Sequence, residues 1–302
     1  MNHPSLAPRR EKTNDNHGKQ SRSAYVQDHT ACEKQAPADY SESGYRTYCK
    51  DWVASVSTSR HCVLWVVAAI AALCVLLVGC SSRPKTESPP VLWINGTHAV
   101  LTKLNNGDVS RFGGIRKNAE NEKRARSMLE QSWEVTDKQQ LLSVISDLSE
   151  GLHNKQLLKE ADNAGLLEIE REAFEQALSE LSEQASIVSY QNMYSAYEQF
   201  GESAILGWDL SRATSLCAYG YVAGYLTYEE AVSRALEIAL RIQQVFDSWD
   251  SFYDSYLYGY QYWREDDPSD TSSGYINRIQ VIEELNNDDN SPFKLSWDLQ
   301  LT

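Results

Sequence analysis

The sequence predicts an all-α protein, with one compact multi-helix domain that follows a single N-terminal apolar segment. Two observations favour helices. Apolar residues recur at three- and four-residue spacing through much of the chain after residue 119, and residues typical of helix N-caps precede several of these stretches. The alternating pattern of a β-strand occurs only in one ambiguous stretch, Val91–Thr102.

The N-terminal part divides into three segments. Residues 1–61 are polar and have no apolar period, which predicts a disordered tail. Cys62–Cys80 form an uncharged apolar run of 19 residues, close to the ~20 that span a bilayer. Residues 81–90 are rich in Pro and Ser and are interpreted as a linker. The folded domain is therefore expected over residues 91–302.

The end of the apolar run, Leu77–Cys80, resembles the lipobox of bacterial lipoproteins. In those proteins the cysteine thiol is acylated and the preceding peptide bond is cut. The resemblance implies a signal peptide, lipidation at Cys80, and contact with the lipid bilayer through the acyl chain. By the same resemblance, Ser81 favours the outer membrane.

The length of the preceding tail leaves two interpretations open. A signal peptide normally begins within ~15–30 residues of its cleavage site, whereas 61 residues precede this run. Either translation starts later, for example at Val53, so that much of the tail is not made, or residues 62–80 are a retained transmembrane helix in the inner membrane. Both interpretations place the protein at the cell envelope.

The first half of the domain carries several helical patterns. Leu92–Leu104 is apolar, and Ala119–Trp133 combines mixed charge with a helical period. Thr136–Gln139 has the form of a capping box, with Thr136 as the N-cap. The helix that follows is expected to stop at Gly151, and Leu166–Leu181 repeats the helical pattern.

The second half has the clearest pattern. A helix is expected over Trp208–Leu226, and Thr227–Glu230 then forms a second capping box. Ser248 is the expected N-cap of a third helix, which places six aromatic residues on one face: Trp249, Phe252, Tyr253, Tyr256, Tyr260 and Trp263. After a loop at residues 265–273, a shorter helix is predicted over Tyr275–Leu285. Residues 291–297 are expected to pack back on the domain.

The charge of the chain excludes one class of partner. The whole chain carries a net charge of −14, and the part after Cys80 has 19 Lys and Arg against 35 Asp and Glu, a net charge of −16. Such a domain repels phosphate backbones, so we expect no nucleic-acid partner. A protein partner with a basic surface is compatible with this charge.

Several segments of the domain resemble one protein family. In the second half these are Gly207–Ala213, Gly220–Tyr225, Ser248–Trp249 and Tyr256–Gly259; in the first half, Ser132–Val135 and Glu150–His153. They are similar to the bacterial domain-of-unknown-function family numbered 1266, over about Val91 to Leu299. The resemblance implies an α-helical domain and no particular reaction.

Trp208, Asp209 and Arg212 are the first candidate site. Asp209 and Arg212 are three residues apart, so they can pair on one helix face. The pair predicts either a structural ion pair or, beneath a tryptophan, a site for a polar ligand. An enzyme with Asp209 as base and Arg212 as anion clamp is the alternative, and it requires an open cleft at Asp209.

Aromatic residues form the second candidate. Trp249, Tyr256 and Trp263 belong to the predicted stripe, which either lies in the core or lines a groove. Tyr258 falls off the stripe with Tyr262, which predicts some exposed aromatic surface. Tyr219 and Tyr225 complete the candidate binding residues. Gly220 and Gly224, four residues apart, are expected to allow close helix packing.

Other chemistry has little support in the sequence. His98 and His153, the two histidines of the domain, are not at metal-ligand spacing, and Cys217 is expected to be a core residue. We expect no metal and no cofactor, and no catalytic residue is assigned. The sequence thus predicts a membrane-anchored binding or structural module. An enzyme and an immunity- or inhibitor-type partner of another protein are the alternatives.

Overall fold

The computed structural model describes residues 87–265 and 269–301. These residues form eleven α-helices and two short 3-10 helices, with no strand among them, which confirms the all-α prediction for this part of the chain. In chain order the elements are α5 (Pro89–Thr97), α6 (Ala99–Leu104), α7 (Ala119–Trp133), α8 (Lys138–Ser149), α9 (Leu152–Asn163), α10 (Arg171–Ser179), α11 (Gln184–Phe200), η1 (Gly201–Ser203), α12 (Leu206–Val222), α13 (Tyr228–Val245), α14 (Trp249–Arg264), α15 (Gly274–Asn287) and η2 (Pro292–Lys294).

The predicted tail, the apolar run with Cys80, and most of the predicted linker lie outside the described residues. Within the described part, no helix combines the length and the apolar character that crossing a membrane requires. Helix α5 begins at Pro89, inside the range 81–90 assigned to the linker. Proline fits this place because the first residue of a helix needs no backbone N–H donor.

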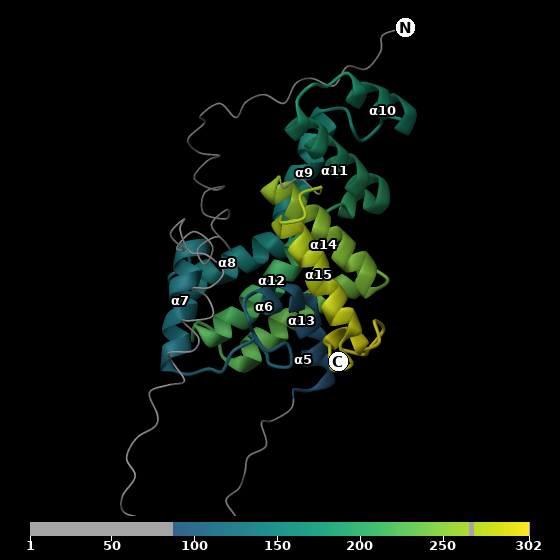
Figure 1. Cartoon of the computed structure of the whole chain (residues 1–302). Coiled ribbons are helices and arrows are strands. Elements are labelled where there is room, and N and C mark those ends of the chain that lie inside the picture. The colour runs from purple at the N-terminus through teal and green to yellow at the C-terminus, as the bar shows by residue number, and fades with distance from the viewer. Residues whose placement is uncertain (1–86, 266–268, 302) are drawn as a thin grey trace, which may run out of the picture. The chain divides into compact units, whose positions relative to one another are not determined.

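Helix α12 lies at the centre of the domain. It contacts α5, α7, α8, α9, α13 and α14, and the first of the two cartoon views shows it inside the bundle (Figure 1). Nearly all of its residues are buried, because apolar and small residues occupy every face of the helix. The prediction extended this helix to Leu226, but it ends at Val222. Gly224, with φ +74°, and the bond from the N–H of Tyr225 to the carbonyl of Gly220 close it.

Two of the three predicted N-caps are confirmed. Thr227 and Glu230 form a capping box at the start of α13, and Ser248 caps α14. The third is displaced by one residue. Asp137 caps α8 by accepting from the N–H of Gln140, and it replaces the predicted Thr136. Thr136 and Asp137 are both favoured cap residues, so spacing alone did not separate them.

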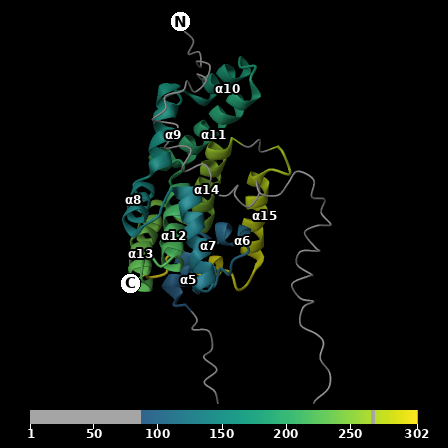
Figure 2. The same cartoon turned by 90° about the vertical axis from the view of Figure 1, so that its left-hand side faces the viewer.

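The described helices enclose two hydrophobic clusters. The larger surrounds α12, and the smaller is built mainly from α9, α10 and α11. Both cartoon views place α10 at one end of the domain and α5 toward the other (Figures 1 and 2). The predicted helix Leu166–Leu181 is only α10 in the structure, and α9 and α11 were not predicted.

The ambiguous stretch Val91–Thr102 is helical, not a strand. It forms α5 and α6, and His98 separates the two helices. Near the C-terminus, the segment after α15 packs back as predicted. The Trp297 indole N–H donates to the carbonyl of Phe246 at 3.1 Å, and the ring of Phe293 stacks on Trp249.

Candidate functional site

Asp209 is fully buried, and helix α9 engages both of its carboxylate oxygens. Its Oδ2 accepts from the backbone N–H groups of His153 and Asn154, each at 2.9 Å. Its Oδ1 lies 2.5 Å from Nδ1 of His153. The predicted ion pair between Asp209 and Arg212 is therefore wrong, because the carboxylate pairs with α9 instead.

This contact caps α9 from a distant part of the chain. The N-cap of α9 is Gly151, which has no side chain to offer, and His153 and Asn154 are the second and third residues of the helix. Their N–H groups have no partner inside the helix, and a carboxylate at a helix N-terminus also interacts favourably with the helix dipole. Asp209 thus supplies the cap that Gly151 lacks.

Asn154 adds a second connection beside the cap. Its side-chain amide donates to the carbonyl of Glu202 at 2.7 Å, and its side-chain oxygen accepts from the N–H of Ile205 at 2.8 Å. Asp209, His153 and Asn154 together fix α9 to the start of α12. A buried carboxylate is tolerated only when it is paired and hydrogen-bonded, and this one is.

Arg212 lies among indole rings, one turn further along α12. Its guanidinium carbon is 4.4 Å from the ring centre of Trp133, 4.7 Å from Trp208 and 5.8 Å from Trp263. These distances are typical of cation–π contacts. Arg212 is 2% exposed, so the arrangement stabilises the junction of α7, α12 and α14.

The close contact between α12 and α14 positions Trp208 beside Arg212. We call Arg212 and the three indole rings around it, those of Trp133, Trp208 and Trp263, the Trp208 cluster. A Cβ at Gly259 would lie 2.2 Å from Cβ of Trp208, and one at Gly207 would lie 2.5 Å from the carbonyl oxygen of Phe252. Only glycine allows α12 and α14 to approach this closely. Gly220 allows close packing against Leu141 of α8, as predicted, whereas Gly224 ends the helix and has no such role.

The remaining aromatic candidates do not gather in one place, and only Tyr256 contacts Trp208. Tyr219 accepts a hydrogen bond from Asn105, and the ring of Tyr225 lies under Arg126. Trp249 packs among Trp93, Phe293 and Trp297, and its indole N–H donates to the carbonyl of Leu295. The Tyr256 hydroxyl accepts from Arg278 near the Trp208 cluster.

The predicted exposed aromatic surface is not found. Tyr258 and Tyr262 are half-buried and pack against the smaller hydrophobic cluster, with the Tyr258 hydroxyl donating to Gln199. Among the described residues, Leu240 is the only large hydrophobic residue classed as exposed. Trp263 is half-buried, and the other five residues of the predicted stripe are buried, so the stripe is chiefly core.

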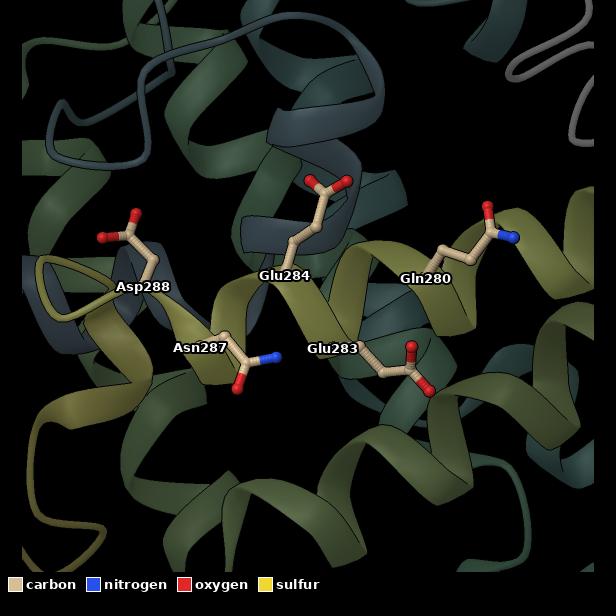
Figure 3. A pocket seen from close by; sticks show the side chains of 5 residues that line it. All are labelled: Gln280, Glu283, Glu284, Asn287 and Asp288. Carbon is tan, nitrogen blue, oxygen red and sulfur yellow. The ribbon is translucent and has the colours of Figure 1, made fainter.

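Two surface hollows lie away from these candidates. One, of about 560 Å³, lies along α15, where the side chains of Glu283, Glu284 and Asn287 point in different directions (Figure 3). The other, of about 530 Å³, lies where the ends of α11 and α13, the first turn of α14 and the C-terminal segment meet. We call the second one the C-terminal pocket. Sequence reasoning found neither, because no motif marks the residues that line them.

The described part of the chain contains no metal-binding cluster and no reactive thiol. No group of three His, Cys, Asp or Glu side chains there is arranged to hold a metal ion. Cys217 is buried, as predicted, and burial raises the pKa of its thiol to about 12. The thiol therefore stays protonated and unreactive at neutral pH.

The comparison with protein families decides the classification. Residues 128–297 match the family described as Protein of unknown function (DUF1266). The chain belongs to the DUF1266 family. The DUF1266 region includes Asp209, His153, Arg212 and the lining of the C-terminal pocket except Asp298, while α5 and α6 lie before it. No curated protein and no solved structure matches the chain.

Proposed function

We propose that this DUF1266 protein is a membrane-anchored module of the cell envelope that binds another protein. The anchor is either an acylated Cys80 or the retained helix 62–80, and Ser81 favours the outer membrane for the acylated form. The lipobox resemblance, the linker that follows it and the net charge of −16 after Cys80 support this proposal.

The state of Asp209 favours a binding or structural role over catalysis. An enzyme built on Asp209 and Arg212 needs both groups to reach a substrate, yet they are 0% and 2% exposed. The hydrogen bonds from α9 already use both oxygens of the Asp209 carboxylate. A general base needs a free lone pair within reach of the proton it removes.

The first experiment determines the state of the N-terminus. Mass spectrometry of the N-terminal peptide from native membranes is expected to show a diacyl or triacyl modification on Cys80, and a Cys80→Ser variant is expected to lose it. An intact Met1 peptide with an unmodified Cys80 would reject lipidation and leave a single-pass anchor. Recovery of the full-length protein from the aqueous fraction would reject both forms of anchoring.

The second experiment tests binding in cells. A photo-crosslinking amino acid is placed at one of three exposed positions on different helices: Gln176 on α10, Leu240 on α13 or Glu283 on α15. We expect a discrete crosslinked species of fixed mass from one position and not from the others, because a specific partner covers one face. Equal, diffuse labelling from all three positions would contradict a specific partner.

A further inference from the structure

The C-terminal pocket combines aromatic rings with carboxylates. Three aromatic residues line it: Phe200 from the end of α11 and Trp297 from the C-terminal segment, both half-buried, and Phe246 after α13, which is buried. Asp247 and Asp298 contribute carboxylates, and Gln244 contributes an amide. Among the described residues, the lining contains no Lys or Arg to neutralise the two acids within the pocket.

The bonding of the lining residues shows which groups are available to a ligand. Oδ1 of Asp247 accepts from Ser251 at 2.7 Å and from Ser248 at 3.0 Å, while its Oδ2 has no hydrogen-bond partner in the described residues. Asp298 and Gln244 are exposed, and no described residue bonds to their side chains. By contrast, Gln243 is occupied, because its amide donates to the carbonyls of Trp297 and Leu299.

The protonation state and the surroundings of Asp247 favour a positive ligand. The hydrogen bonds from Ser251 and then Ser248 lower the pKa of Asp247, so its carboxylate is ionised at neutral pH. The surrounding chain adds to this negative potential, since residues 201–302 contain 17 Asp and Glu against 6 Lys and Arg. Such a field increases the rate of encounter with cationic partners.

We propose that the C-terminal pocket receives an arginine side chain from a basic partner protein. A guanidinium group stacks on aromatic rings and donates to carboxylates in the same plane, so it uses both kinds of lining group at once. A lysine ammonium group has no flat face to stack. The inference rests on the proposed binding function and adds the place and the chemistry of contact.

The test uses the full-length protein in detergent and a fluorescent oligo-arginine peptide as the probe, with binding followed by anisotropy at physiological salt. An oligo-citrulline peptide of the same length is the control, because citrulline keeps the shape of arginine without its charge. We expect the arginine peptide to bind, an oligo-lysine peptide to bind more weakly, and the citrulline peptide not to bind.

Matched variants separate the pocket from general attraction to an acidic surface. The pair Asp247→Asn/Asp298→Asn is expected to weaken binding about tenfold or more, since it removes both carboxylate partners of the guanidinium. The pair Glu283→Gln/Glu284→Gln makes the same change in charge on α15 and is expected to weaken binding less than about threefold. Equal losses in the two pairs would overturn the proposal.

A third variant blocks the pocket without changing the core. Gln244→Arg places the chain's own guanidinium at an exposed lining position and is expected to abolish peptide binding. Gln176→Arg, on α10, adds the same charge elsewhere and is expected to leave binding unchanged. If both arginine variants bind the peptide like the unmodified protein, the pocket is not the site. A discrete crosslink in cells from another face, together with that result, would overturn the pocket and leave the binding function standing.

Discussion

At the scale of single residues, Asp209 joins two helices that are far apart in the chain. Its carboxylate accepts hydrogen bonds from the N-terminal N–H groups of α9 and is hydrogen-bonded to the ring nitrogen of His153. The carboxylate has no contact with solvent. Removal of one partner from a buried, charged hydrogen-bonded group leaves the other partner unsatisfied. The stability of the domain should therefore depend on this single carboxylate.

We predict that Asp209→Asn lowers the free energy of unfolding by about 2–4 kcal/mol, because an amide accepts from fewer donors and carries no charge. Urea unfolding of the full-length protein at neutral pH measures this change. Asp147→Asn is the control: Asp147 is exposed on α8, and its substitution should change the free energy by less than about 0.5 kcal/mol. Equal effects of the two substitutions would show that the cap contributes no stability.

His98, between α5 and α6, is expected to make the stability of the domain depend on pH. Burial lowers its pKa from the ordinary 6.5 to about 4, so the folded domain keeps it neutral. Between these two values the unfolded chain binds a proton that the folded chain does not, and stability falls as the pH falls from 6.5 toward 4. The loss attributable to His98 is about 3 kcal/mol, since one pKa unit corresponds to about 1.4 kcal/mol.

The measurement for His98 is the free energy of unfolding across this pH range, for the unmodified protein and for His98→Gln. Acidic residues add a pH dependence that both proteins share, so the difference between the two curves isolates the histidine. We expect the difference to change steadily below pH 6.5 and to be constant above it. Parallel curves would mean that His98 titrates normally in the folded domain.

At the scale of helices, the contact between α12 and α14 depends on glycine. Exchange of glycine for alanine inside a helix usually stabilises it by up to about 1 kcal/mol. Gly259→Ala should instead destabilise the domain by about 1–3 kcal/mol, because the new methyl group would overlap Trp208 and force the helices apart. Thermal unfolding measures the effect, and Ser233→Ala, at an exposed position of α13, is the control. A Gly259→Ala variant as stable as the control would mean that the interface adjusts freely.

Some helices could be predicted from the sequence and others could not. Helices α13 and α14 were predicted because a cap and a regular apolar period mark each of them. Helix α9 was missed because its buried residues include His153 and Asn154, which break the apolar pattern. Helix α11 likewise buries Ser186, Ser189 and Asn192. Polar residues inside a core become intelligible only when their partners are known.

In the candidate site, the burial of the residues could be predicted from the sequence, but their partners could not. Burial of Trp208, Asp209 and Arg212 follows from their place in a helix with no polar face. The partner of Asp209 does not follow from spacing, since His153 lies 56 residues earlier. One local signal was present: Gly151 begins a helix without a capping side chain, which requires an acceptor from elsewhere.

At the scale of the whole described domain, two hydrophobic clusters of unequal size are joined near the start of α12. The smaller cluster, built mainly from α9, α10 and α11, has fewer apolar residues than the larger one, and α10 lies at the end of the domain (Figures 1 and 2). Units with fewer buried contacts open at lower free energy than the main core. The Asp209 cap and the bonds of Asn154 are part of the polar connection between the two clusters, to which Asn192 of α11 adds a bond to the carbonyl of Tyr258.

We therefore predict that native-state hydrogen exchange of the full-length protein shows lower protection in α10 and α11 than in α12 and α13. In the Asp209→Asn variant, protection should fall in α9, α10 and α11 by more than the fall in α13, because the substitution weakens the attachment of the smaller cluster. Asp147→Asn should leave both sets of amides unchanged. An equal loss of protection in all helices of Asp209→Asn would mean that the two clusters open together, and that Asp209 stabilises the domain only as a whole.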